Sequence, residues 1–241
     1  NTMACLTEAI GMSLPGTGAA PARTAKKQRL AEMAGERVME LVRQGVTARQ
    51  IVTRASLENA IRVDMALGGS TNTALHIPAI AHAAEVDIKL DDFDRLSRET
   101  PQLASLRPGG DLMMEDLEVA GGIPAVLKSL APLLDLDCLN VGGLTLAGII
   151  KSAPVGDPGV IHSLDDPIAQ QGGIAVLRGS LAPDGAVVKQ GAVGAEMMQF
   201  TGMARVFDGE DAAMGYLREG KVVPKDVLIV RYEGPKGGPG M

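Results

Sequence analysis

The chain closes with the sequence VLIVRYEGPKGGPGM, residues 227–241. Its first four residues form an apolar run that predicts a β-strand. The residues after that run are so rich in glycine and proline that they cannot lie inside a helix. Because glycine carries no Cβ, the backbone of this loop can approach a ligand closely. We therefore expect the loop to line a site, with Lys236, Gly237 and Gly238 as candidate substrate-binding residues.

Other short strand signals precede this one. They are runs rich in valine, isoleucine and alanine that are bounded by turn residues, and Pro183-Asp184-Gly185 is a turn signal between two of them. Residues 208–217 have a helical pattern with Asp208 as the expected N-cap. We therefore expect a mainly β part from residue 173 onward. The earlier strand runs are residues 173–177, 186–189 and 204–207.

The first 150 residues carry a helical pattern instead. Apolar residues recur at three- and four-residue spacing between Thr24 and Gln44, and Gly45 is expected to end that helix. Thr47 is expected to cap a short helix, and Ser56 another. Further helices are expected at about residues 73–84, from Asp91 to just before Pro101, and at about residues 124–134 and 145–151.

A segment rich in proline, glycine and aspartate, residues 156–172, separates the two patterns. The fold class that follows is α/β. A helix-rich α/β part takes residues 1–155, the linker takes 156–172, and the mainly β part takes 173–241.

The composition limits the partners. The chain is 46% hydrophobic but only 2% aromatic and has no Trp, so its core must be built from Ala, Val, Leu, Ile and Met. The formal net charge is -6 and no cluster of Lys and Arg is flanked by aromatic residues, which argues against a nucleic-acid partner. No apolar run reaches the length of a membrane span, so we expect no membrane partner and a cytoplasmic protein.

The turn Gly68-Gly69-Ser70-Thr71-Asn72-Thr73 is a candidate anion site. Free N–H groups at a helix start, together with hydroxyl and amide side chains, suit a carboxylate or a phosphate. Ser70, Thr71 and Asn72 are therefore candidate substrate-binding residues. The same residue types are the preferred helix caps, so a purely structural turn stays open as the alternative.

For several other polar residues, the sequence does not decide between a functional and a structural role. Glu115 and Asp116 suit a metal or an acid/base role, but they also suit a helix start. Lys189 ends a predicted strand and points either to solvent or to a substrate anion. Cys5 and Cys138 form no CxxC pair, and we expect each to be a small buried thiol.

Five segments carry a family pattern. They are NTMACLTEA with LPG in residues 1–16, ENAI with VDMALGGSTNT in 58–73, MED with AGGIPA in 114–125, LAPDGAVVK at 181–189 and RYEGPKGGPGM at 231–241. In this order they resemble the dihydroxy-acid/6-phosphogluconate dehydratase family, essentially from end to end. The form of the last segment favours the branch that acts on branched-chain dihydroxy acids.

The resemblance implies a hydro-lyase that converts 2,3-dihydroxy carboxylates, such as 2,3-dihydroxyisovalerate, to 2-keto acids in branched-chain amino acid biosynthesis. It implies an iron–sulfur cluster, whose open iron acts on the C3 hydroxyl, and a Mg²⁺ ion on the substrate oxygens. It also implies an α/β domain followed by a β-barrel-like domain, and a homodimer. A 6-phosphogluconate or sugar-acid dehydratase is the alternative within the family.

The positions that carry the family's chemistry do not match residues of this chain. The cluster cysteines, and the Asp and modified Lys that hold magnesium, match segments before Asn1. The magnesium-binding Glu and the serine base match positions after Met241, so Glu233 is not that Glu. We therefore expect no catalytic, cofactor-binding or metal residue here, and an internal fragment of a longer enzyme with both domains truncated. The alternative is a naturally short, non-catalytic relative that acts as a binding module.

Overall fold

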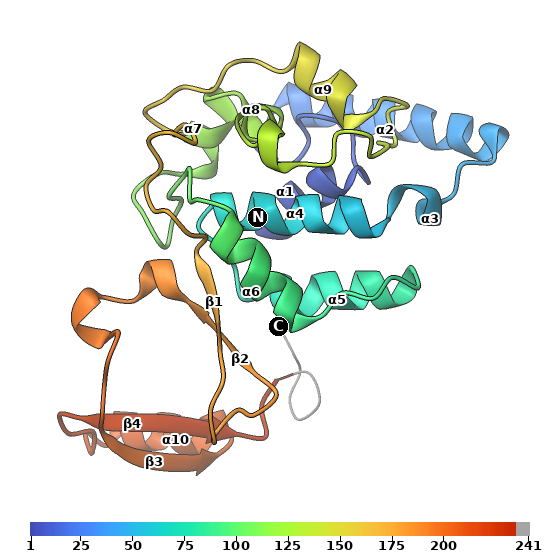
Figure 1. The fold of residues 1–241 in the computed structure, drawn as a ribbon. Coiled ribbons are helices and arrows are strands. Elements are labelled where there is room, and N and C mark those ends of the chain that lie inside the picture. Colours follow the sequence, from blue (N-terminus) through green and yellow to red (C-terminus); the bar gives the residue numbers. More distant parts are fainter. Residues whose placement is uncertain (235–241) are drawn as a thin grey trace. The chain divides into compact units, whose positions relative to one another are not determined.

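The computed structural model describes residues 1–234. The chain divides into two compact units, residues 1–192 and the part from Val193 onward, and each is described by itself (Figure 1). The predicted site residues Lys236, Gly237 and Gly238 lie outside the described residues.

Unit 1 consists of helices and one β-hairpin (Figure 1). The helix-rich pattern predicted for the first 150 residues is confirmed. The helices are α1 (Thr2–Ile10), α2 (Ala25–Gln44), α3 (Ala48–Ile51), α4 (Arg54–Ala66), α5 (Thr73–Ala83), α6 (Leu90–Glu99), α7 (Met114–Val119), α8 (Gly122–Ser129) and α9 (Leu146–Ser152), with 3-10 turns η1 (Ala131–Leu133) and η2 (Gln190–Ala192).

Helix α4 is the centre of the core of unit 1. Helices α1, α5, α6 and α8 all pack against it. Leu57, Ile61 and Met65 are fully buried on it, and burial of such side chains is worth roughly 1.5–3 kcal/mol each. Their spacing of four residues places them in one row along the helix.

The start of α4 corrects one sequence prediction. Thr53, not Ser56, is the N-cap, and its hydroxyl accepts a hydrogen bond from Ser56 N at 3.2 Å. Ser56 Oγ in turn accepts from Thr53 N at 2.9 Å, which completes a reciprocal capping box. Both residues are good caps, and the sequence alone does not say which of them leads the helix.

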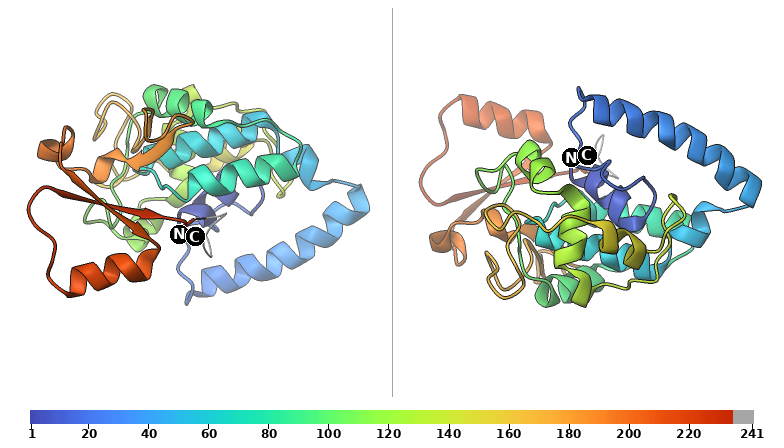
Figure 2. Two further views of the ribbon diagram at one scale, coloured as in Figure 1. Left: turned by 90° about the horizontal axis from the view of Figure 1, so that it is seen from below. Right: turned by 90° about the horizontal axis from the view of Figure 1, so that it is seen from above.

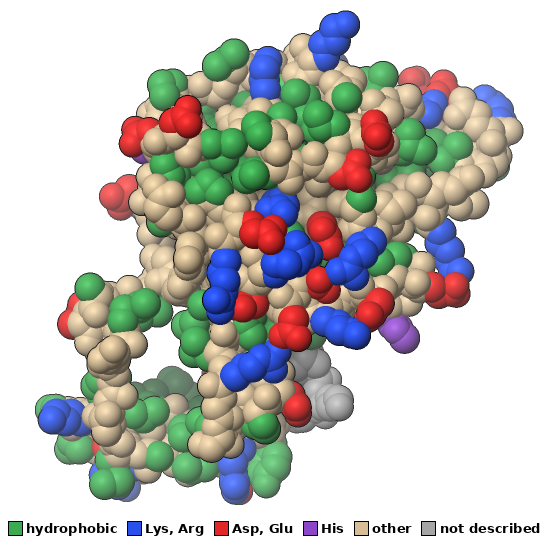
Figure 3. All heavy atoms as spheres, viewed as in Figure 1, with side chains coloured by type: hydrophobic (Ala, Val, Ile, Leu, Met, Phe, Trp, Pro, Cys, Tyr) green, Lys and Arg blue, Asp and Glu red, His purple; other side chains and the backbone are tan. Residues whose placement is uncertain are grey.

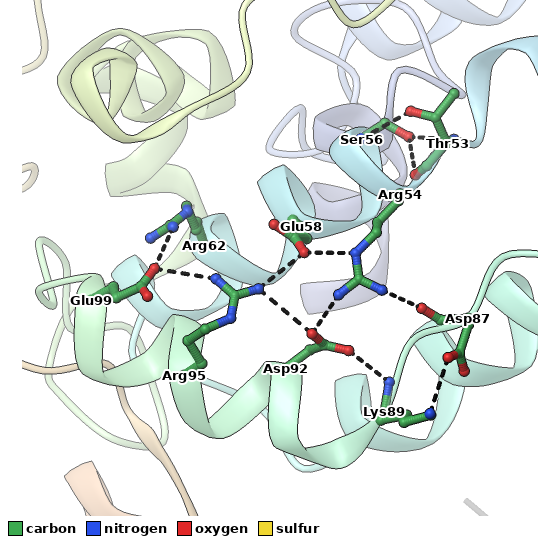
Figure 4. A network of polar contacts seen from close by, with 10 residues as sticks. All are labelled: Thr53, Arg54, Ser56, Glu58, Arg62, Asp87, Lys89, Asp92, Arg95 and Glu99. Atoms are coloured by element: carbon green, nitrogen blue, oxygen red, sulfur yellow. Dashed lines mark hydrogen bonds and ion pairs between the residues drawn. The ribbon is translucent and has the colours of Figure 1, made fainter.

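A row of ion pairs joins α4 to α6 (Figure 4). Arg95 Nη2 lies 3.0 Å from Glu58 Oε1, and Arg54 Nη2 lies 2.5 Å from Asp92 Oδ1. Burial alone would raise the pKa of Asp92, but the Lys89 N–H and the Arg54 guanidinium outweigh it and lower that pKa. Side chains of both charges gather on this face of unit 1 (Figure 3).

Helix α2 lies at the periphery of unit 1 in both views of Figure 2. Its ends are as predicted, because Thr24 Oγ1 accepts from Lys27 N and Gly45 ends the helix in the left-handed conformation at φ 67°. Its apolar face is not covered, however, since only Leu30 is buried while Met33, Val38 and Val42 are exposed.

The hairpin of unit 1 is formed by β1 (Ile174–Leu177) and β2 (Ala186–Lys189). The two strands are antiparallel and pair Ile174 with Lys189. The turn predicted at Pro183-Asp184-Gly185 lies between them, so both strands and their order are confirmed.

Unit 2 contains η3 (Ala195–Met197), β3 (Met203–Asp208), α10 (Glu210–Arg218) and β4 (Asp226–Arg231). Strands β3 and β4 are parallel, and α10 is the crossover between them. The prediction that Asp208 is the N-cap of this helix is wrong. Asp208 is the last residue of β3, and Gly209 takes the cap position.

Each sheet among the described residues has two strands. The α/β class with a helical N-terminal part is therefore confirmed, whereas the barrel-like arrangement and the domain limits at residues 155 and 173 stay predictions. Among residues 1–234, no helix has the length and apolar character that crossing a bilayer requires.

Candidate functional site

The turn between α4 and α5 is built by two left-handed glycines. Gly68 and Gly69 have φ values of 93° and 73°, which residues with a Cβ rarely adopt. Gly69 N donates to Asp64 O at 2.8 Å, so the chain turns sharply where α4 ends. Ser70 and Thr71 then lead into α5.

The backbone of this turn packs directly against the backbone of Gly173 and Ile174, where β1 begins. A Cβ added to Gly173 would lie 1.9 Å from the carbonyl oxygen of Gly68, and one added to Gly69 would lie 2.6 Å from Ile174 Cγ1. Ser97 Oγ of α6 also donates a hydrogen bond to Ile174 O at 2.5 Å. The β1–β2 hairpin is therefore held against the end of α4.

The hairpin brings Lys189 to a polar pocket. This pocket has a volume of about 290 Å³, and the predicted residues Ser70 and Thr71 both line it. Lys189 at the end of β2 is half-buried there, and the exposed Arg107 also lines this pocket. The remaining lining residues are Asn1, Thr2, Cys5, Asp64, Leu67, Gly69, Leu106, Pro108 and Met114.

Asp64 is the buried acid of this pocket and has no exposed surface. Its Oδ2 accepts from Ser70 N at 3.3 Å, whereas its Oδ1 has no hydrogen-bond partner. Burial raises the pKa of Asp64 to about 7, against the opposing influence of the Ser70 N–H, the nearby Thr73 hydroxyl and the Lys189 charge. The Thr73 hydroxyl lies close enough to influence Asp64, but its Oγ1 makes no hydrogen bond.

Sequence reasoning missed Asp64. A signal for it was present, because a carboxylate between Val63 and Met65 interrupts an apolar stretch of α4 in which both neighbours are fully buried. A charged residue inside such a stretch is rarely fully buried without a partner.

The other predicted residues lie elsewhere. Asn72 is exposed at the N-cap position of α5 and does not line the pocket. Asp116 Oδ2 accepts from Met113 N at 2.7 Å, so this acid begins α7, as the structural alternative predicted. Glu115 is exposed in the first turn of the same helix.

The two cysteines are free thiols. Cys5 is buried, as predicted, and burial raises the pKa of its thiol to about 12, while Sγ donates to Gly18 O at 3.9 Å. Cys138 is only half-buried, which corrects the prediction, because it lies in the loop before α9. Burial raises its pKa to about 11. A protonated thiol is a poor nucleophile and a poor metal ligand.

A second buried acid is structural. Glu8 accepts hydrogen bonds from Gly16 N and Gly18 N at 2.6 Å each. Both carboxylate oxygens are therefore used to hold the loop of residues 15–18, although burial raises the pKa of this group. Among the described residues, no group of three or more His, Cys, Asp or Glu side chains could hold a metal ion.

A larger cavity of about 450 Å³ lies beneath α2, but its walls are mostly apolar. Its cationic side chains are already used, since Arg37 Nε donates to Val141 O at 2.5 Å and Lys27 Nζ donates to Thr17 O at 2.7 Å. The smaller pocket has convergent polar groups, and a binding site for a polar ligand needs those groups.

Comparisons with known proteins cover the whole chain. Residues 1–149 match the family described as dihydroxy-acid/6-phosphogluconate dehydratase N-terminal, and residues 159–241 match its C-terminal counterpart. Proteins named dihydroxy-acid dehydratase are 55% identical in Geotalea daltonii, 56% in Geobacter metallireducens and 53% in Methanothrix thermoacetophila. All three alignments cover 100% of this chain. The chain spans 43% of the length of the first two relatives and 45% of the third.

Proposed function

Because this chain belongs to the dihydroxy-acid/6-phosphogluconate dehydratase family, we propose that the complete protein dehydrates 2,3-dihydroxy carboxylates to 2-keto acids. The preferred substrate is 2,3-dihydroxyisovalerate, in branched-chain amino acid biosynthesis. The names of the relatives, at 52–56% identity, support this branch of the family.

One structural observation carries the proposal. The pocket joins Ser70 and Thr71, from the part that matches the N-terminal family description, with Lys189, from the part that matches the C-terminal one. Two cationic side chains and three hydroxyls, those of Thr2, Ser70 and Thr71, line this pocket of about 290 Å³ and suit a small polar anion such as a dihydroxy acid.

Dehydration removes a proton from C2 and hydroxide from C3, and the resulting enol tautomerises to the 2-keto acid. The residues of this chain supply binding and orientation for that reaction. Holding a substrate in its reactive geometry lowers the barrier, since the entropy of positioning is lost before the chemical step.

The iron–sulfur cluster and the Mg²⁺ ion that the resemblance implies do not fit the described residues. These residues offer no cluster of metal-ligating side chains, and the Cys5 thiol is protonated and donates to a carbonyl. We therefore propose that both groups bind to residues of the complete protein outside this chain.

The test is an assay of the complete protein, with its metals loaded, on 2,3-dihydroxyisovalerate. We expect formation of 2-oxoisovalerate. Turnover of 6-phosphogluconate without turnover of 2,3-dihydroxyisovalerate would assign the protein to the other branch. A loaded protein that turns over neither substrate would support the non-catalytic binding module.

We further propose that the complete protein is a homodimer in the cytoplasm. The exposed apolar face of α2 supports an additional contact surface in the complete protein. Light scattering of the complete protein measures the assembly directly.

A further inference from the structure

Strand β4 ends in a turn that contains two left-handed residues. Tyr232 has a φ of 61° and Gly234 a φ of 94°. Glycine adopts this conformation freely, but an aromatic residue rarely does, because its Cβ crowds the backbone. Neighbouring contacts must hold a residue in such a conformation, and residues of this kind gather at functional sites. The turn leads directly into residues 235–241, the segment that the sequence predicts to line a site.

Glu233, between these two residues, caps helix α10. Its Oε1 accepts a hydrogen bond from Glu210 N, the first N–H of the helix, at 3.0 Å. The residue at the N-cap position is Gly209, which has no side chain to accept that bond. Glu233 therefore supplies, from 23 residues further along the chain, the acceptor that the cap position lacks.

Helix α10 is a firm anchor for this contact, because it packs on both β3 and β4 (Figure 1). The rings of Phe207 on β3 and Tyr216 on α10 have centroids 5.2 Å apart. The Tyr216 hydroxyl also donates to Asp226 Oδ2 of β4 at 3.4 Å. The start of α10 is thus fixed on the strands, and Glu233 ties the turn after β4 to it.

We propose that Glu233 is a positioning residue, which binds the start of α10 and thereby holds the loop of residues 235–241 in place to bind substrate. The proposal deepens the proposed function and rests on it. The dipole of α10 favours a carboxylate at this point, whereas the acidic Glu210 and Asp211 in the same turn oppose one. We therefore expect the acceptor oxygen of Glu233, and not its charge, to be what the loop requires.

The reach of the chain gives the size of the effect. Lys236, a candidate substrate-binding residue, lies three residues beyond Glu233 and five beyond Arg231, the last residue of β4. Extended residues span about 3.4 Å each, so Lys236 reaches about 10 Å from a fixed Glu233 but about 17 Å from Arg231. The volume open to Lys236 grows with the cube of this reach, about fivefold. The fraction of protein with the loop in its binding position falls by the same factor.

The experiment is steady-state kinetics of the complete protein, with its metals loaded, on 2,3-dihydroxyisovalerate. Glu233→Ala should raise the KM about fivefold, because fewer molecules are competent to bind. It should change kcat by less than about twofold, since bound substrate itself holds the loop. Glu233→Gln keeps an acceptor oxygen and should restore most of the KM. A carboxylate that bound substrate or metal directly would lose as much in Glu233→Gln as in Glu233→Ala.

A second variant separates positioning from the stability of α10. Ala213 is a buried residue of this helix, and Ala213→Gly lowers helix stability without changing Glu233. We expect this variant to keep the KM of the unaltered protein.

Limited proteolysis tests the same contact without turnover. Trypsin cleaves after Lys236, and the mass of the product identifies this cut. Cleavage there should be about fivefold faster in Glu233→Ala than in Glu233→Gln, because the rate follows the population of the released loop. Both variants lack the same negative charge, so the comparison does not depend on how trypsin responds to a nearby acid. Ala213→Gly should be cut at the rate of the unaltered protein.

Three outcomes would overturn the proposal. They are an unchanged cleavage rate after Lys236 in Glu233→Ala, a KM raised as much in Glu233→Gln as in Glu233→Ala, and a KM raised as much in Ala213→Gly. Turnover of 2,3-dihydroxyisovalerate with an unchanged KM in Glu233→Ala would leave the proposed function in place and reject the positioning role. Faster cleavage in Glu233→Ala, in a loaded protein that turns over no dihydroxy acid, would reject the function and keep Glu233 as the residue that orders the loop.

Discussion

At the scale of single residues, Asp64 combines two properties that rarely occur together. It is fully buried, and one of its carboxylate oxygens has no hydrogen-bond partner. Burying a charge without a full set of partners costs several kcal/mol, so the protein favours the neutral acid. The sequence could predict that Ser70 and Thr71 lie in a polar turn before a helix, because turns are determined by neighbouring residues. It could not predict their approach to Lys189, which depends on contacts between segments more than a hundred residues apart.

The titration of Asp64 predicts a pH-dependent stability. Its pKa is raised from about 3.9 in an unfolded chain to about 7, so the folded state binds more protons between these values. The free energy of unfolding that Asp64 contributes therefore falls as the pH rises from about 4 to 7, and is constant above that range. Asp64→Asn removes the titrating group. Relative to the unaltered protein, this variant should gain about 2.7 kcal/mol between pH 5 and pH 8, which is about two pH units at roughly 1.36 kcal/mol each.

Chemical denaturation of both proteins at pH 5 and pH 8 gives this difference. Asp165→Asn is the matched control, because it makes the same change of atoms at an exposed position outside the pocket. A stability difference between Asp64→Asn and the unaltered protein that is equal at the two pH values would contradict the prediction.

At the scale of elements, local signals predicted helices and hairpin strands well but predicted their surroundings poorly. Gly45 and Thr145 mark helix ends in the sequence and in the structure, because caps are set by residues within one turn. The apolar face of α2 was also visible in the sequence, yet a periodic pattern indicates only that a face is apolar. Whether another segment covers that face depends on the arrangement of the whole molecule.

The α4–α6 ion pairs give a prediction at this scale. Arg95 contacts Glu58, Asp92 and Glu99, whereas Arg98 on the same helix contacts only Asp94 among the described residues. Single exposed pairs contribute little, but a shared guanidinium couples several charges.

We therefore expect Arg95→Ala to destabilise the protein by about 1 kcal/mol and Arg98→Ala by less than about 0.5 kcal/mol. The difference should shrink in 1 M salt, since salt screens exposed charges. Thermal melts at low and high salt measure it, and equal effects of the two variants would show that the network adds nothing to its separate pairs.

At the scale of the whole molecule, the described residues leave much apolar surface uncovered. On α2 the exposed fractions are 53% for Met33, 51% for Val38 and 69% for Val42. In unit 2, Phe200 and Val206 are exposed by 46% and 51%. An uncovered apolar helix face such as that of α2 marks an interaction site or a region prone to aggregation.

We expect a protein consisting of residues 1–241 alone to self-associate. Replacing Val38 with Glu and Val42 with Lys together should lower the light scattering of this protein, whereas Val119→Lys, which changes a single exposed residue away from α2, should not. A sharp, cooperative melt of a soluble monomer of residues 1–241 would contradict the expectation.

The contact between Gly68 and Gly173 has a consequence for how this sequence can diverge. In most packed pairs, a larger residue on one side is tolerated if its partner becomes smaller. Here the partner of the missing Cβ is a backbone carbonyl, 1.9 Å away, and no substitution can shrink it. A larger residue at position 173 therefore cannot be compensated by any substitution at position 68. In a library of random variants, Gly173 should stay glycine because of this contact and Gly68 because of its left-handed φ of 93°. The neighbouring exposed turn at Thr71 should accept many residues as long as ligand binding is not part of the selection.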